Sequence, residues 1–201
     1  TTPSWSYYFA GVGLLHSLGP LGDANGDGYA DLAFGQANNQ THFFFGGPTG
    51  LSASPDQVFV REVGWPPGLG FRTAGAGDVN GDGFSDAIAA TTSDLPAYGG
   101  TAYMHMGSPN SPDPTPALIL GGDAAGDQFG AAVASDGDVD GDGFDDLLIG
   151  APLSDTAAGA DAGGASLYLG GPGGPDATAD WSVAGTVAAG ALAEAVAHVG
   201  D

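Results

Sequence analysis

A nine-residue pattern of acidic residues and glycines occurs three times along the 201-residue chain. The copies span residues 23–31, 78–86 and 138–146, and each has Asp or Asn at positions 1, 3, 5 and 9 and Gly at positions 4 and 6. Glycines let a chain turn tightly, and oxygen ligands at this spacing suit a hard cation that takes about six to eight oxygens. The pattern therefore predicts three metal-binding loops.

Calcium is the cation that we expect in these loops. Without a cation, the ligand side chains would place three negative charges in each of the first two loops and four in the third, and each pair at about 4 Å repels by about 4 kcal/mol at an effective dielectric near 20. Magnesium prefers to keep several waters rather than accept an all-protein cage. The expected ligands are the side chains at positions 1, 3, 5 and 9 and the backbone carbonyl at position 7: Asp23, Asn25, Asp27, Tyr29 and Asp31; Asp78, Asn80, Asp82, Phe84 and Asp86; Asp138, Asp140, Asp142, Phe144 and Asp146.

The residues that flank the loops exclude an EF-hand. That site needs a bidentate Glu at position 12 and a helix on either side, whereas position 12 here is Phe34, Ala89 or Ile149. Each loop is followed by a short apolar run bounded by small residues, as is typical of a strand buried on both faces. The loops are therefore expected to join β-strands.

Composition supports an all-β chain and limits its partners. The 38 Gly and 14 Pro indicate frequent turns. Two Lys+Arg against 24 Asp+Glu give a formal charge of −22, which three calcium ions would reduce to −16. This field repels nucleic acid and anionic lipid, so we expect neither nucleic-acid binding nor membrane insertion.

The expected location follows from the metal. Weak calcium loops fill only where calcium is abundant, and no cysteine is present to add disulfides. We therefore expect a secreted or cell-surface protein, and the composition rich in Ala, Gly and Asp suggests a bacterial source.

The loops belong to a longer repeat. The aspartate at position 1 recurs at residues 23, 78 and 138 and again at 201, a period near 60 residues. Each unit contains four expected strands: a first before the loop (14–23, 69–78, 129–138 and 192–201), a second after it (31–35, 86–90 and 146–150), a third (41–47, 101–107 and 165–171) and a fourth (57–60, 117–120 and 181–184). Four strands per repeat are typical of a β-propeller blade.

The third unit resembles the repeats of a known family. Phe129-Gly130, the nine-residue loop, Gly150-Ala151-Pro152 and a third strand ending in Gly170-Gly171 are similar to FG-GAP repeats, the blades of the integrin α-subunit propeller and of many bacterial surface proteins. The other units depart from the pattern in places, and Leu192-Ala193 stands where the last one would have Phe-Gly. The resemblance implies extracellular recognition or cell adhesion, with calcium as a structural cofactor.

The resemblance also implies how the chain divides. Residues 1–201 would form a single propeller region: 1–10 as the outer strand of a preceding blade, 11–62, 66–121 and 126–185 as blades, and 190–201 as the first strand of a further, truncated blade. Propellers typically need about four to eight blades, so three cannot close a ring. We expect part of a ring of about seven blades, completed by the rest of a longer chain, another copy or a partner chain.

A binding role is expected rather than catalysis. The four histidines are dispersed over different strands, and the aspartates that could form a carboxylate pair are needed for calcium. The partner would be a protein or a carbohydrate, with Trp65 and Tyr98 as candidate contacts because they lie in connections. Two alternatives stay open: a sugar-binding lectin propeller, and a non-catalytic accessory propeller of a secreted hydrolase or lyase.

Overall fold

The computed structural model describes residues 5–8, 15–36, 40–60, 72–92, 99–109, 112–135 and 137–197. In these residues the chain forms three four-stranded antiparallel sheets. The first contains β1 (Leu15–Gly22), β2 (Asp31–Gln36), β3 (Gln40–Phe44) and β4 (Gln57–Val60); the second β5 (Arg72–Gly77), β6 (Asp86–Thr91), β7 (Thr101–His105) and β8 (Leu118–Gly121); the third β9 (Ala132–Ala134), β10 (Leu147–Ala151), β11 (Gly164–Tyr168) and β12 (Trp181–Ala184). Among the described residues no helix is long and apolar enough to cross a membrane.

Each sheet is a meander in which sequential strands pair. The four-strand unit predicted from the sequence is therefore confirmed, although several strand ends differ by a few residues and two of these differences have a clear cause. The first strand of the third unit begins at Ala132 rather than Phe129, because Phe129 N donates to Gly99 O, just before β7, and Gly130 has a left-handed φ of 85°. The third strand of the first unit ends at Phe44, because Gly46 N donates to the Asp31 carboxylate instead of a neighbouring strand.

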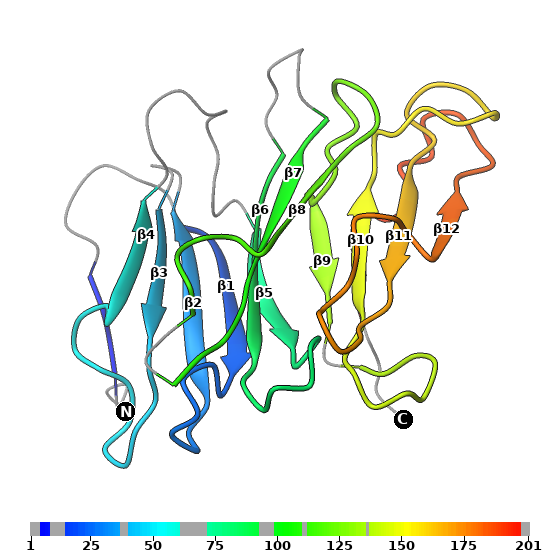
Figure 1. Cartoon of the computed structure of the whole chain (residues 1–201). Helices are drawn as coiled ribbons and strands as arrows, with labels where there is room; N and C mark the ends of the chain where they lie inside the picture. Colours follow the sequence, from blue (N-terminus) through cyan, green and yellow to red (C-terminus); the bar gives the residue numbers. More distant parts are fainter. Residues whose placement is uncertain are drawn as a thin grey trace.

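The three sheets stand side by side in chain order (Figure 1). The first strands β1 and β5 contact each other, and β5 contacts β9. The loops of residues 23–31, 78–86 and 138–146 all project from the same end of the sheets, the lower end in Figure 1. The three repeated patterns, far apart in sequence, thus share one rim of the molecule.

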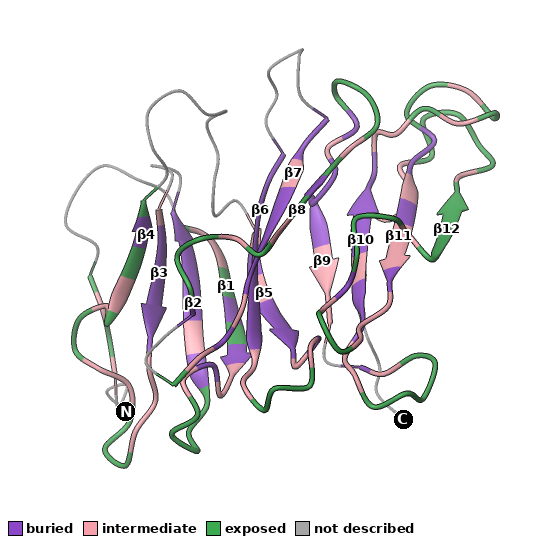
Figure 2. Ribbon diagram, in the orientation of Figure 1, coloured by how far each residue is buried: buried purple, intermediate pink, exposed green. Residues whose placement is uncertain are grey.

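Apolar side chains fill the space between the sheets. Leu21, Phe43 and Phe59 of the first sheet pack with Ala87 of the second, and a larger cluster around Met104 joins the second sheet to the third. Fully burying a side chain of this size contributes about 1.5 to 3 kcal/mol. Figure 2 shows the consequence: β2, β6 and β10 are largely buried, whereas β12 is exposed along its whole length.

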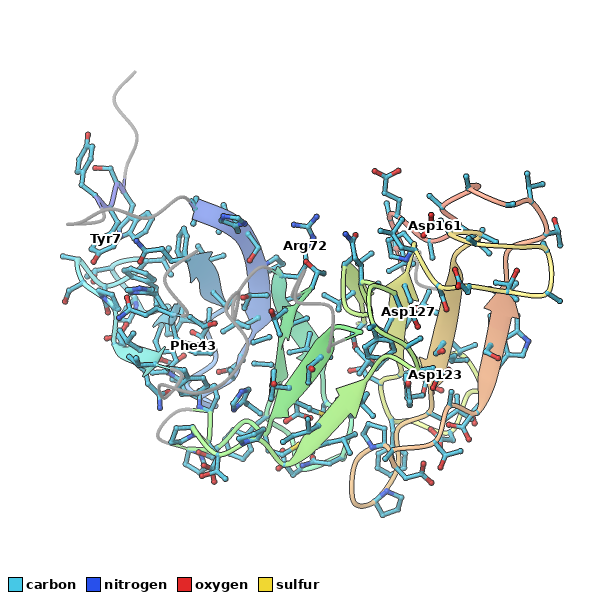
Figure 3. The ribbon with its side chains drawn as sticks, turned by 90° about the horizontal axis from the view of Figure 1, so that it is seen from above. Tyr7, Phe43, Arg72, Asp123, Asp127 and Asp161 are labelled. Carbon is cyan, nitrogen blue, oxygen red and sulfur yellow. The ribbon has the colours of Figure 1, made fainter. Side chains whose placement is uncertain are left out.

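The described N-terminal residues cover the outer face of the first sheet. Trp5 and Tyr7 pack against Phe44, with the Tyr7 and Phe44 ring centroids 4.9 Å apart (Figure 3 labels Tyr7). Between the first and second sheets, the rings of Phe59 in β4 and His105 in β7 also pack together, with their centroids 4.7 Å apart. The structure assigns no strand to residues 5–8, so their place in a preceding blade stays a prediction, but their contacts resemble those of an outer strand.

The segment after β12 repeats an earlier backbone conformation. Gly126, Gln128 and Gly130 have positive φ angles, and so do Ala189, Ala191 and Ala193, each 63 residues later. The interstrand contacts recur with the same offset: Gly122 N donates to Gly100 O, and Gly185 N donates to Gly163 O. This is the conformation that leads into the third sheet, although the further blade itself stays a prediction.

Candidate functional site

The aspartate at position 1 anchors each of the three loops. In the third loop, Asp138 Oδ1 accepts hydrogen bonds from Gly141 N at 2.6 Å and Asp142 N at 3.0 Å, and its Oδ2 accepts one from Gly143 N at 2.7 Å. The same three bonds recur in the other two loops at 2.7 to 3.0 Å. Gly143 and its counterparts have φ angles near 90°, a region open to glycine. The sequence thus builds one loop geometry three times.

The aspartate at position 9 is the buried member of each loop. Asp31 and Asp86 are fully buried and Asp146 is 3% exposed. Asp146 accepts hydrogen bonds from Val139 N at 2.6 Å, within the loop, and from Gly170 N at 2.8 Å, just after β11. Asp31 and Asp86 make the corresponding two bonds. This side chain therefore ties the loop to the end of the third strand of its own sheet.

Three carboxylates converge in the third loop. Ligand oxygens of Asp138, Asp140 and Asp146 all lie within 4.8 Å of one another, a group that could hold a metal ion. In the first two loops an asparagine stands at position 3, and Asn25 Nδ2 lies 3.4 Å and Asn80 Nδ2 3.0 Å from the carboxylate at position 5. The donor atoms are oxygens, which are the ligands that calcium prefers. The residues present therefore fit a calcium ion.

Burial and crowding set the protonation of these carboxylates. Burial raises the pKa of Asp86 to about 7, the charges of Asp82 and Asp78 act in the same direction, and hydrogen bonds from two backbone amides oppose the shift. Desolvation and the charge of Asp142 raise the pKa of Asp140. Hydrogen bonds, first from Gly143, lower the pKa of Asp138. A bound cation would favour the ionised form of all of these groups.

Neighbouring loops are joined by backbone hydrogen bonds. Ser85 N of the second loop donates to Asp23 O of the first at 2.9 Å, and Asp145 N of the third donates to Asp78 O of the second at 3.2 Å. A Cβ added at Gly26 would lie 2.3 Å from the ring of Phe84. The aromatic residue at position 7 of one loop thus covers the glycine at position 4 of the loop before it.

The same contact recurs once more along the rim. A Cβ added at Gly81 would lie 2.5 Å from the ring of Phe144, whereas one added at Gly141 would meet no described atom within 4 Å. The second loop is accordingly covered by the third sheet, with Val79 fully buried, and the third loop is open, with Val139 56% exposed.

Comparisons with known proteins agree with this geometry. The FG-GAP repeat model matches residues 129–168, which contain the third loop with the strands around it. The chain contains an FG-GAP repeat. Integrin alpha-7 of Rattus norvegicus is 32% identical over 154 residues, 68% of this chain, and integrin alpha-6 of Gallus gallus is 28% identical over 173 residues, 77% of this chain. Integrin alpha-PS2 of Drosophila melanogaster is 34% identical over 90 residues, 39% of this chain.

These matches cover a small part of the relatives. The chain spans 12% of the length of the rat integrin chain, 15% of the chicken chain and 6% of the fly chain. All three relatives come from animals, so they give no support to the bacterial source expected from composition. The three sheets have the strand number and order of propeller blades, and we call them the first, second and third blade below.

The sequence-predicted ligand contacts Trp65 and Tyr98 lie outside the described residues of the chain. A different feature, which sequence reasoning missed, lies between the second and third blades. It is a cleft of about 530 Å³, and its lining includes Asp123, Asp127 and Ser166. Figure 3 shows Asp123 and Asp127 between these two blades. The signal in the sequence was a serine at residue 166, where the second blade has Tyr103 at the same position of its third strand.

Proposed function

We propose that the chain is a calcium-stabilised FG-GAP propeller module that takes part in adhesion-type recognition outside the cell. The observation that carries the calcium part is the threefold loop, in which a position 1 aspartate held by three amides and a buried position 9 aspartate recur with the same partners. The similarity to integrin α-chains supports the adhesion part.

Calcium would have a structural role in this proposal. Each ion would be held by the side chains at positions 1, 3, 5 and 9 and by the position 7 carbonyl of its loop. Bound there, it supplies positive charge that offsets the repulsion among the carboxylates. The chain's own residues hold the loops in place. Asp31, Asp86 and Asp146 connect each loop to its blade, and the amides of Ser85 and Asp145 connect one loop to the next.

The wider setting is also a proposal. Three blades would form part of a larger ring, with the other blades supplied by the rest of a longer chain, another copy or a partner chain. The module would act at the cell surface or after secretion, without catalysis of its own, and would recognise a protein. The accessory propeller of a secreted hydrolase or lyase remains the alternative, and sequencing of the flanking coding region distinguishes the two.

Thermal unfolding in the presence and absence of calcium tests the proposal. A ligand that binds only the native state stabilises it by about 2.7 kcal/mol per site at a hundredfold excess over Kd. The melting temperature in millimolar Ca²⁺ should therefore lie well above that in EDTA, and magnesium at the same concentration should restore less of the difference. Superimposable melting curves would contradict a structural role for calcium. Calorimetric titration should give three ions per chain.

A further inference from the structure

The two interfaces between blades are packed differently. In β7 of the second blade, Tyr103 and His105 are buried and share one face, and His105 contacts Phe59 of the first blade. In β11 of the third blade, Ser166 and Tyr168 occupy the same two positions and both line the cleft toward the second blade. A tyrosine in one interface is thus replaced by a serine in the next. Part of the space that Tyr103 fills between the first two blades is left open between the second and third.

The cleft has the size of a small-molecule site. Its volume is about 530 Å³, within the range of about 300 to 1,000 Å³ that is typical of such sites. Most of its lining belongs to the third blade, with Ser166, Tyr168 and Ser182 from β11 and β12, whereas Gly121 ends β8 of the second blade and Asp123 and Asp127 lie in the connection between β8 and β9. None of the calcium-loop residues lines it, so a ligand here would be independent of the metal proposal.

Hydroxyl groups and carboxylates dominate the chemistry of the cleft. Burial raises the pKa of the Tyr168 phenol, the neighbouring Ser166 side chain opposes this shift, and the charge of Asp123 adds to it. This hydroxyl therefore stays neutral at physiological pH and keeps both donor and acceptor capacity. The residues that line the described cleft include three aspartates and no lysine or arginine, so an anionic ligand would be repelled.

Asp127 provides a fixed acceptor at the edge of the cleft. It is 4% exposed although it carries a carboxylate. Its Oδ2 accepts a hydrogen bond from Ala124 N at 3.0 Å, and the Ser154 hydroxyl lies 3.5 Å from the same oxygen. These contacts hold the carboxylate in place against the cleft. A ligand rich in hydroxyl groups would meet acceptors at the aspartates and paired donors and acceptors at the serines and Tyr168.

We propose that the cleft between the second and third blades binds a neutral polyhydroxylated ligand, a mono- or disaccharide, through Asp127, Ser166, Tyr168 and Ser182. A carboxylate accepts hydrogen bonds from sugar hydroxyls, and serine and tyrosine hydroxyls can serve either side of such a bond. An organic cation would pair with the carboxylates but would offer few hydrogen-bond partners to the hydroxyl groups of Ser166, Tyr168 and Ser182. The lining therefore favours the neutral ligand.

Ligand-observed NMR on the 201-residue chain tests this inference. The probes are neutral saccharides (glucose, galactose, mannose, fucose, N-acetylglucosamine and lactose) with putrescine as the cationic comparison, all in saturating Ca²⁺. At least one saccharide should bind with a saturable, millimolar or tighter Kd. The variant Ser166→Tyr should weaken that binding at least tenfold, because the new ring occupies the space that Tyr103 occupies in the other interface.

Two further variants keep the result interpretable. Ser54→Tyr makes the same change at an exposed serine of the first blade and should leave binding unchanged. Asp127→Asn keeps an oxygen acceptor for Ala124 N but removes the charge, and should weaken binding several-fold with the melting temperature nearly preserved. The proposal is overturned if no saccharide in the set binds, if putrescine binds instead, or if Ser166→Tyr with a native melting curve binds the saccharide as well as the wild type.

Discussion

The second and third blades have nearly the same strand plan but different surroundings. The second is covered on both faces, so that Val79 is fully buried and Gly81 lies under the Phe144 ring; the third is covered on one, so that Val139 is exposed and Gly141 has no described neighbour within 4 Å. The sequences of their loops do not show this difference, since both carry a valine at position 2 and glycines at positions 4 and 6. The same loop can thus serve as a packing surface or as an open rim, depending on the neighbouring blade.

The largest expected difference concerns the position 4 glycines. Both Gly81 and Gly141 have positive φ angles, of 73° and 81°, so an alanine at either costs about 1 kcal/mol in backbone strain. Gly81→Ala adds a collision with Phe144 worth about 1 to 3 kcal/mol. Urea unfolding in saturating Ca²⁺ should therefore give a loss of about 2 to 4 kcal/mol for Gly81→Ala and about 1 kcal/mol for Gly141→Ala. Equal losses would show that Phe144 does not cover the second loop.

The position 2 valines give a second matched pair. Val79→Ala removes two methyl groups from a fully buried position and should cost about 2 kcal/mol, the transfer of those groups plus the cavity left behind. Val139→Ala removes the same groups from an exposed position and should change stability by less than about 0.5 kcal/mol. The comparison uses urea unfolding of the two variants and the wild type; a loss at Val139 similar to that at Val79 would mean that the third blade is covered in solution.

Calcium affinity should separate the two loops by their residue at position 3. The third loop has Asp140 where the second has Asn80, and affinity rises with the number of charged ligands. We expect Asp140→Asn to weaken the tightest site by roughly tenfold, about 1.4 kcal/mol, and Asn80→Asp to strengthen the second site by a similar factor. Calorimetric titration of both variants measures this, and unchanged isotherms would contradict the ranking of sites by charge.

The smallest effect should be the pH dependence contributed by His105, on the side of the second blade that faces the first. Burial lowers the pKa of His105, with Asp113 acting in the opposite direction, and Nδ1 of the ring lies 2.9 Å from Asp113 O. Because its folded pKa lies below the ordinary value of 6.5, the unfolded state binds more protons and stability falls as the pH decreases through about 6.5. His105→Phe should lose less stability than the wild type between about pH 7.5 and 5 in saturating Ca²⁺. Parallel curves for the two proteins would exclude a contribution from His105.

Much of the fold could be predicted from the sequence because the loops locate it. Once residues 23–31, 78–86 and 138–146 are placed as strand connections, the apolar runs on either side and the Gly/Pro turns fix the positions of the other strands, and the observed strands agree to within a few residues at most ends. The main exception is Phe129, whose backbone N–H donates to Gly99 O, before β7, rather than to the adjacent strand β10.

Contacts between blades could not be predicted in this way. Phe84 and Phe144 were expected to matter only for their backbone carbonyls, yet their rings cover the glycines of the preceding loops. The cleft depends on Ser166 together with Asp123 and Asp127, which act across a blade interface that periodicity does not describe. The calcium ligands themselves stay predictions, and Trp65 and Tyr98 lie outside the described residues.

The backbone hydrogen bonds between loops have a mechanical consequence. Ser85 N to Asp23 O and Asp145 N to Asp78 O connect successive loops, and Ser108 N to Ala24 O and Gly171 N to Val79 O run beside them. A tensile force that separates neighbouring blades along the rim must load two main-chain bonds at each junction together, instead of opening them one after another. The rim of loops would therefore resist the stepwise separation of neighbouring blades. In the proposed adhesion role the module would be subject to forces of that kind, and these hydrogen bonds would carry part of the load from blade to blade along the rim.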